Sequence, residues 1–434
     1  MINTEIPSNH QTISQAENKT ISTSKNLTVP NQDPQPSKRT KEIKENQKAI
    51  EDYKKICAKT YASPSTQIIS QLRSDTLNLF LENFELKGIN AIVKILNKYT
   101  YFLHIKLGPY DPRRGESMKQ KKTEQNKNLT QGEQDKEKRE KRDQEIQRNL
   151  MIKNIVLGIS KNLKISLNLI TFNLTNLKIT KEMSEVLSPG LINNKSLKAL
   201  SINNCTISIE SYDILLKGLL THETLSYLDL SYNNLNDKYS DMIARIISRQ
   251  TQRRDQVIWA FGLRNEKPTS NDYANGLISI NLKGNLLSDS SAEDISNSLG
   301  YDQYIRNIDV SCNKFSKDGC KKFIRMMRKN NTLLTVDLKE NPGYDEEIHG
   351  RIVMKMAKNI KFLYNKYLNE EYNEEEFQNY KTFIDESFFD VDIPQEIIDN
   401  YNSNMITIDE PKTGERNDNQ EEEIGEKYES ENNI

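Results

Sequence analysis

Hydrophobic positions return along this chain at a constant spacing. A pattern of the form Leu-x-x-Leu-x-Leu-x-x-Asn-x-Leu is clearest between Leu225 and Leu235. Its starts are separated by 28, 28, 52, 28 and 28 residues, at Leu169, Leu197, Leu225, Leu277, Ile305 and Leu333. In the Leu-x-Leu part, successive side chains of an extended backbone point to opposite faces. Each pattern therefore predicts a short strand with its leucines inward and the intervening side chains on an open surface.

The stretch between two predicted strands has the periodicity of a helix. In the unit that starts at Leu197, apolar side chains recur at the spacing of one helical face, at Tyr212, Leu215, Leu216 and Leu219. A single strand–helix unit cannot bury its own apolar faces, so neighbouring units must stack. The repeat predicts an α/β leucine-rich-repeat solenoid. Units of 28 residues indicate the ribonuclease-inhibitor-like horseshoe, with a parallel sheet on its concave face and disordered flanks.

A polar residue closes most of the predicted strands. An Asn side chain at this step is expected to bond backbone groups of the turn, which otherwise lack partners. Cys205 and Leu177 replace the asparagine in two repeats, and the step is Asn at Asn233, Asn285, Asn313 and Asn341. Weaker patterns at residues 77–84 and 102–107 bring the expected number of repeats to about eight.

Polar and charged segments flank and interrupt the array. The composition predicts a disordered tail at 1–45, a capping helix with the first repeats at 46–107, a charged insert at 108–148, the main array at 149–344 with a second insert at 250–275, C-terminal capping helices at 345–400, and an acidic disordered tail at 401–434. The first insert is expected to end in a mixed-charge helix that runs into residues 152–163. This insert is either a solvated loop or a docking segment for an acidic surface such as a tubulin tail.

Charge and composition narrow the classes of function. The net charge of −1 gives no general attraction to nucleic acid or to an anionic membrane. The four cysteines are scattered without a C-x-x-C pair, and no apolar run is long enough to span a membrane, so a cytoplasmic protein with reduced thiols is expected. The sequence carries no Gly-rich phosphate loop, zinc-ligand spacing or nucleophile motif, and its four histidines are far apart. We therefore expect a non-catalytic protein that binds other proteins, without a cofactor, metal or small-molecule substrate.

The second insert supplies one set of candidate binding residues. Arg253, Arg254 and Arg264 lie in it beside Trp259, the only tryptophan of the chain. The favoured interpretation is that Trp259 packs the extra loop onto the array. The alternative is that it anchors a partner, since exposed Trp and Arg side chains often dominate interfaces.

The open surface of the predicted sheet supplies a second set. The middle residue of successive strands forms a polar, mildly acidic stripe, which consists of Ser201, Asp229, Asn281, Asp309 and Asp337. Tyr227 and Lys283 are expected beside it. These side chains are predicted to face solvent and serve either solubility or a basic or amide-rich partner segment. Three neighbouring aspartates also invite a cation, although no metal motif supports one.

The second insert also carries a resemblance to a known family. Its residues are Gln250-Thr-Gln-Arg253-Arg254, Trp259, Leu263-Arg264, Pro268 and Gly276-Leu277. At the same point of its repeats, the 78-kDa centrosomal leucine-rich-repeat protein family has a similar stretch. The resemblance implies a cytoskeletal location at the centrosome, basal body or cilium, and a scaffold role in ciliogenesis and in cilium-length or centriole regulation. It also implies centriolar or ciliary protein partners. Family members usually continue into a long coiled-coil region, whereas this chain ends in an acidic tail without heptads.

Three other functions remain open at this point. The chain could be a structural component of the axoneme, or an adaptor or regulator of a ubiquitin-ligase complex. It could also be a GTPase activator, because the activator of Ran shares this type of repeat. Such an activator supplies a polar or arginine side chain to the nucleotide, for which Arg253, Arg254 and Arg264 would be candidates.

Overall fold

The computed structural model describes residues 38–84, 86–109, 131–267 and 275–368. The chain divides into two compact units, residues 1–41 and 42–434, and all the repeats lie in the second. The predicted tail at 401–434, most of the tail at 1–45, the basic part of the first insert and the predicted capping segment at 369–400 lie outside the described residues.

The predicted strands form one parallel sheet of eight strands in sequence order. Leu228 pairs with Leu200 at an offset of 28 residues and with Ile280 at an offset of 52, as the spacing of the repeats predicts. The strands are β1 (Thr76–Phe80), β2 (His104–Gly108), β3 (Thr171–Thr175), β5 (Ala199–Asn203), β7 (Tyr227–Asp229), β8 (Ser279–Asn281), β9 (Asn307–Asp309) and β10 (Thr335–Asp337). Two short strands, β4 (Lys178–Ile179) and β6 (Thr206–Ile207), form a second parallel sheet. The α/β leucine-rich-repeat solenoid is thus confirmed.

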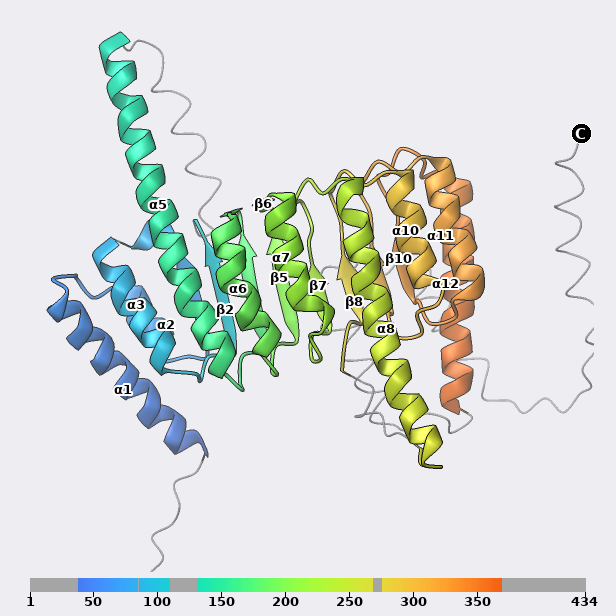
Figure 1. Ribbon diagram of the computed structural model, residues 1–434, viewed down its shortest axis with the longest axis horizontal. Helices are drawn as coiled ribbons and strands as arrows, with labels where there is room; N and C mark the ends of the chain where they lie inside the picture. Colours follow the sequence, from blue (N-terminus) through green and yellow to red (C-terminus); the bar gives the residue numbers. More distant parts are fainter. Residues whose placement is uncertain (1–37, 85, 110–130, 268–274, 369–434) are drawn as a thin grey trace, which may run out of the picture. The chain divides into compact units, whose positions relative to one another are not determined.

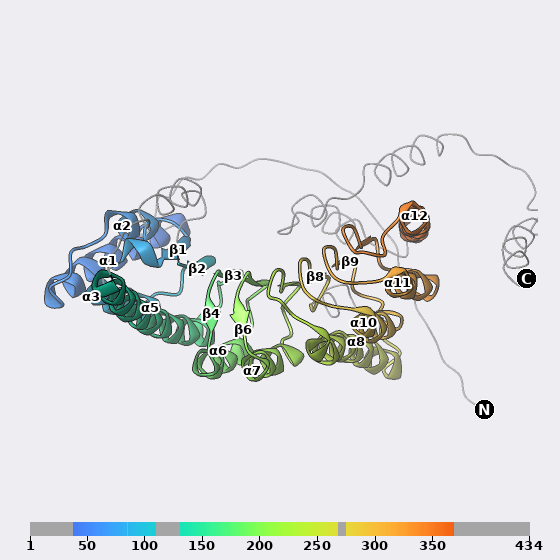
Figure 2. The same cartoon turned by 90° about the horizontal axis from the view of Figure 1, so that it is seen from above.

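The helices between successive strands lie on one side of the sheet, as Figure 2 shows. Helix α12 packs against α11 and β10, at the C-terminal end of the array. The helices are α1 (Lys38–Lys59), α2 (Thr66–Gln71), α3 (Leu86–Lys98), α5 (Gln131–Ile165), α6 (Lys181–Asn193), α7 (Ile209–Leu220), α8 (Ser240–Leu263), α10 (Asp289–Leu299), α11 (Lys317–Lys329) and α12 (Glu346–Leu368), with single turns η1 (Leu81–Asn83) and η3 (Asp237–Tyr239).

Helix α5 joins the end of the first insert to the array without a break. Its side chains at 138–148 are all exposed, whereas Ile155, Ile159 and Leu163 are fully buried. In Figure 1 the first half of this helix extends beyond the neighbouring helices. The predicted mixed-charge helix is therefore present. Among the helices that the structure describes, none is both long and apolar enough to cross a membrane.

The core consists of leucine and isoleucine side chains stacked in register from strand to strand. Leu200, Leu228, Ile280 and Ile308 occupy the same position of successive strands, and each is at most 2% exposed. Burying such a side chain contributes about 1.5–3 kcal/mol. Every repeat shares its apolar surface with the next, which is why the array folds as one continuous core.

Asparagine side chains link the repeats at the step where the chain leaves each strand. The Asn285 amide donates to the carbonyls of Leu230 (3.1 Å) and Leu282 (2.8 Å), and its oxygen accepts from the amides of Asn233 and Leu235 (3.0 Å each). Asn233, Asn313 and Asn341 are buried and make equivalent bonds. The predicted role of this step is confirmed, and each asparagine joins two repeats.

The residue before this step has a left-handed backbone in six successive repeats. The φ angle lies between 49° and 67° at Asn176, Asn204, Tyr232, Gly284, Cys312 and Glu340. Non-glycine residues pay a steric cost in this region. In five of the six, the backbone amide of this residue donates to a carbonyl of the next repeat (2.8–3.2 Å), which stabilises the turn.

A second series of buried asparagines, which the repeat pattern does not predict, lies at the opposite ends of the strands and is called the second ladder below. Asn330 donates from its amide to the carbonyls of Leu299 and Asp302 (2.7 and 2.8 Å), one repeat earlier. Asn162, Asn194 and Asn359 donate in the same way from their own repeats. These side chains satisfy helix-end carbonyls that have no partner within the helix.

Candidate functional site

The second insert continues one helix of the array well beyond its neighbours. Helix α8 has 24 residues, whereas α7 has 12 and α10 has 11. Gln250, in the middle of α8, donates to the carbonyls of Leu219 (3.2 Å) and His222 (2.9 Å), so it takes the place of an asparagine in the second ladder. Residues 251–263, called the helix extension below, follow this point and extend past α7 and α10 in Figure 1.

The base of the helix extension is attached to the array through a buried arginine. The Arg254 side chain is only 2% exposed, its Nε donates to the Asn275 carbonyl (3.1 Å), and its guanidinium lies 4.7 Å from the centre of the Tyr304 ring. Burial lowers the pKa of Arg254 to about 10. Gly276 makes room for this side chain, because a Cβ atom there would lie 2.3 Å from Arg254. Thr251 adds a bond to Asp302 of the following repeat.

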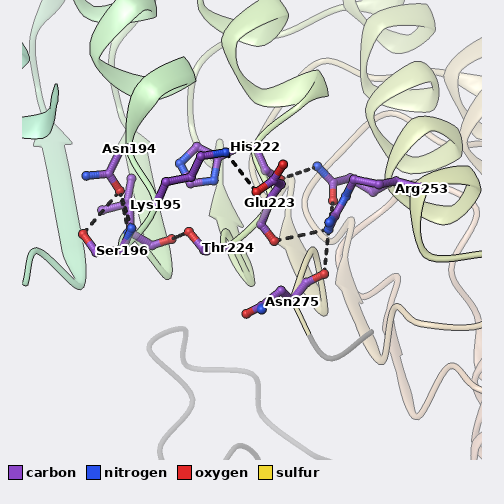
Figure 3. Close-up of polar contacts among 10 residues, drawn as sticks. Asn194, Lys195, Ser196, His222, Glu223, Thr224, Arg253 and Asn275 are labelled. Carbon is purple, nitrogen blue, oxygen red and sulfur yellow. Dashed lines mark hydrogen bonds and ion pairs between the residues drawn. The ribbon is translucent and has the colours of Figure 1, made fainter. Parts of the chain in front are cut away.

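A second arginine joins the helix extension to the residues before β8. Arg253 Nη2 donates to the carbonyls of Asn275 (2.6 Å) and Glu223 (3.2 Å), and Figure 3 shows it reaching from α8 towards both residues. Lys198 Nζ donates to Asn275 Oδ1 (2.8 Å). Lys198, Arg253 and Arg254 therefore meet at Asn275, and they are called the cationic cluster below. Lys198 and Asn275 lie outside the repeat consensus, so no pattern in the sequence singles them out.

Trp259 does not pack against the array, and the favoured sequence interpretation is wrong. Its side chain is 66% exposed, and that of Leu263, one turn later on the same helical face, is 67% exposed. Arg264 is also exposed, lies 4.7 Å from the centre of the Phe261 ring and pairs with Glu266 (2.8 Å). The extension continues past the ends of α7 and α10, which explains why these helices do not cover the tryptophan.

Two aspartates of the stripe on the open face are buried, although the sequence predicts that they face solvent. Asp229 and Asp309 are only 4% and 5% exposed, whereas Tyr227, Asn281, Lys283 and Asp337 are half-buried. Each Asp or Asn of the stripe accepts from the amide two residues later, at 2.8–2.9 Å, in the pairs Asp229–Ser231, Asn281–Lys283, Asp309–Ser311 and Asp337–Lys339. The carboxylates bend back onto their own backbone, so they stabilise the turn and offer little surface to a partner.

Asp309 is therefore expected to lower stability through its charge and to raise it through its hydrogen bond. Burial raises the pKa of Asp309 above its ordinary value of 3.8. A carboxyl with a higher pKa in the folded chain than in the unfolded chain lowers stability as the pH rises above the unfolded-chain pKa, and the full cost is present above the raised pKa. Asp309→Asn keeps the acceptor oxygen and removes the charge. We expect this variant to have a higher free energy of unfolding than the original chain at pH 7, in urea titrations.

Below the ordinary pKa of 3.8, the Asp309 carboxyl is protonated in the folded chain and in the unfolded chain. The stability advantage of Asp309→Asn should therefore disappear near pH 3. The control is Asp309→Ala, which removes the acceptor of the Ser311 amide and should destabilise the chain at both pH values. An Asp309→Asn variant that is less stable at pH 7 would contradict this account of the stripe.

The described residues contain no group of three or more His, Cys, Asp or Glu side chains placed to hold a metal ion. His104 contacts Thr171 Oγ1 through Nδ1 (2.9 Å), and His222 is buried in a different repeat. The suggestion that the aspartate stripe binds a cation therefore gains no support from the geometry.

Curated relatives of this chain share one name. Centrosomal protein of 78 kDa from Mus musculus is 28% identical over 219 residues, which are 49% of this chain and 24% of that protein. The protein of the same name from Homo sapiens is 31% identical over 127 residues, 29% of this chain and 18% of that protein. The Xenopus tropicalis protein is 28% identical over 111 residues, 25% of this chain and 15% of that protein. The matched region thus spans a quarter or less of each relative.

Solved structures with a similar arrangement include the tropomodulin C-terminal domain of Caenorhabditis elegans, at 15% identity and a TM-score of 0.33, covering 42% of this chain and 98% of that one. The actin-binding site 2 of leiomodin-1 matches at 13% identity and a TM-score of 0.33, covering 42% and 93%. Similarity at this level does not bear on function. No family model matches the chain. The named relatives confirm the resemblance seen in the sequence, and the chain is consistent with the family of centrosomal proteins of 78 kDa.

Proposed function

We propose that this chain is a non-catalytic protein of the centrosome or basal body that binds other proteins through its repeat array. The support is the shared name of its curated relatives and the solenoid fold, because solenoids present long continuous binding surfaces. A scaffold role in ciliogenesis, and in cilium-length or centriole regulation, is the finer form of the proposal. Centriolar or ciliary proteins are the proposed partners.

The exposed apolar face of the helix extension is the observation that supports protein binding. Trp259 and Leu263 lie one helical turn apart and are both about two-thirds exposed. Large apolar side chains contribute to stability only when buried, so these two contribute little to this fold. The helix beneath them is attached through Arg254, Gln250 and Thr251. A helix that is attached to the array at its base and exposes a Trp and a Leu side chain resembles an interface hot spot.

The test is the position of a fluorescently tagged full chain in ciliated cells, beside a centriole marker. We expect the original chain at centrioles or basal bodies, and a several-fold weaker signal there for Trp259→Ala, since loss of a hot-spot side chain costs about 2 kcal/mol or more of binding. The free energy of unfolding should change by less than about 0.5 kcal/mol, because the residue is exposed.

The matched control is Tyr301→Ala, which removes an 80% exposed aromatic side chain from another helix end and should leave the position unchanged. A diffuse signal for the original chain would refute the centrosomal proposal. A signal along the cilium would favour an axonemal component instead. Normal localisation of both variants would remove Trp259 from the proposed interface and leave the location intact.

A further inference from the structure

Three positively charged side chains meet at one neutral residue. The Asn275 carbonyl accepts from Arg253 and Arg254, and its side-chain oxygen accepts from Lys198, at 2.6, 3.1 and 2.8 Å. From this geometry we infer that the cationic cluster is a binding site for an oxyanion, a phosphate or carboxylate group carried by a partner. This site is separate from the apolar face of Trp259 and does not depend on it.

Every acceptor that the cationic cluster contacts is uncharged. Besides Asn275, Arg253 reaches only the Glu223 carbonyl and the Gln250 amide oxygen (3.4 Å), and Arg254 stacks on the Tyr304 ring. Partly buried charges in proteins are normally paired with an opposite charge. Among the described residues, none of the three cations forms an ion pair, so no described carboxylate bonds directly to the charge of the cluster.

The carboxylates nearby already have other partners. Glu223 pairs with Lys195 (2.9 Å), as Figure 3 shows, and Asp255 accepts from the Tyr304 hydroxyl (2.6 Å). Asp302 accepts from Thr251 Oγ1 and from the amides of Tyr304 and Ile305 (2.9 and 2.6 Å). Asp302 attracts Arg254 at longer range, without a direct bond. The hydrogen bonds of these three carboxylates therefore go to backbone amides and to other side chains, and not to the cationic cluster.

Two donors of the cluster are buried and unpartnered within the described residues. They are Arg254 Nη2 and Arg253 Nε, and leaving such a donor unpaired costs about 1–3 kcal/mol. Both ring nitrogens of the buried His222 also lack a partner. Burial, together with the neighbouring Lys195, Arg253 and Lys198 charges, lowers the pKa of His222 to about 4, whereas Glu223 acts in the opposite direction. His222 is therefore neutral at pH 7 and adds no charge to the cluster.

An oxyanion matches this arrangement in charge and in hydrogen bonding. A phosphate or carboxylate offers only acceptors, several on one group, and guanidinium groups donate to them with two parallel N–H groups. Lys198 and Arg253 are both partly exposed, so an anionic group can approach these two side chains from solvent. The unpaired Arg253 Nε and Arg254 Nη2 are buried, so they add positive charge to the site and no direct bond.

The experiment measures binding of inorganic phosphate to the purified full chain, from the broadening of its ³¹P resonance at constant ionic strength. This readout does not depend on unfolding. We expect broadening with the original chain and at least about fivefold weaker binding for Lys198→Gln, which loses one charge-assisted hydrogen bond. Among the described residues, the Lys198 ammonium hydrogen-bonds only to the Asn275 side chain, so the fold should survive. Lys339→Gln, half-buried on the open face, is the matched control and should bind phosphate normally.

Competition with acetate distinguishes the two sources of the anion. If acetate does not displace the phosphate, the partner carries a phosphoryl group. If acetate displaces the phosphate at similar concentration, the partner carries carboxylates. Both results support the site. Absence of broadening with the original chain, or equal broadening with Lys198→Gln, would overturn the proposal. Circular dichroism of each variant verifies that a lost signal does not come from a lost fold.

Discussion

Asn285→Ala is expected to destabilise the array by about 4 kcal/mol, since two buried backbone amides lose their acceptor at about 1–3 kcal/mol each and two carbonyls lose one of their two donors. The amides are those of Asn233 and Leu235, and the carbonyls are those of Leu230 and Leu282, which still accept from the Asn233 and Asn313 side chains. Alanine can replace none of these bonds, and the side chain is only 3% exposed, so water cannot easily do so. Urea unfolding followed by far-ultraviolet circular dichroism measures the loss.

The matched control is Asn281→Ala, four residues earlier in the same repeat. Asn281 is half-buried and accepts one bond, from the Lys283 amide (2.9 Å), so its replacement should cost about 1 kcal/mol. Because a repeat array can unfold in parts, the slope of the transition should be compared as well as its midpoint. Equal losses for the two variants would show that the ladder does not dominate the stability of the array.

Gly276→Ala is expected to lower stability by about 3 kcal/mol through two separate effects. The φ angle of 132° at Gly276 is one that side-chain-bearing residues rarely adopt. The new Cβ would also lie 2.3 Å from the Arg254 guanidinium, which is held between Asn275 and Tyr304 and cannot move away without losing those contacts. Thermal unfolding of the full chain measures the combined effect.

Gly284→Asn serves as the control for backbone conformation alone. Its φ angle of 67° is close to that of Asn176 and Asn204, which occupy the same position of other repeats at 57° and 49°. Its new Cβ would meet the ring of Tyr232, a side chain that is 48% exposed and free to rotate outward. We expect a loss of about 1 kcal/mol or less. A Gly276→Ala variant no less stable than Gly284→Asn would contradict the proposed packing of Arg254.

The asparagine ladder was predictable because the repeat itself encodes it. Asn233 and Asn285 follow their leucines at a constant step, and a turn beside a buried strand always leaves backbone groups to satisfy. Gln250 was not predictable in this role, since it lies within a helix and reaches the second ladder only because α8 does not end there.

The two wrong expectations have a common physical origin. Helical periodicity shows which residues share a face with Trp259, but it does not show what lies against that face. Because the helix extension is longer than the neighbouring helices, those helices do not cover Trp259. Strand alternation likewise places Asp309 on the open face. It does not show that the carboxylate bonds its own backbone and is enclosed by side chains of strands about 4.8 Å away.

The strand–helix unit, its register, its inward leucines and the asparagine step are predictable from the amino-acid pattern, because they depend on local spacing repeated many times. Three features follow only from the packing of the folded chain: which polar groups are buried, the enclosure of Arg254 beside Gly276, and the contact of Lys198 and Arg253 with Asn275. Those contacts join residues from different repeats and from an insert outside the repeat pattern. Periodicity describes each unit in isolation, whereas burial and charge pairing are set by what the neighbouring units leave uncovered.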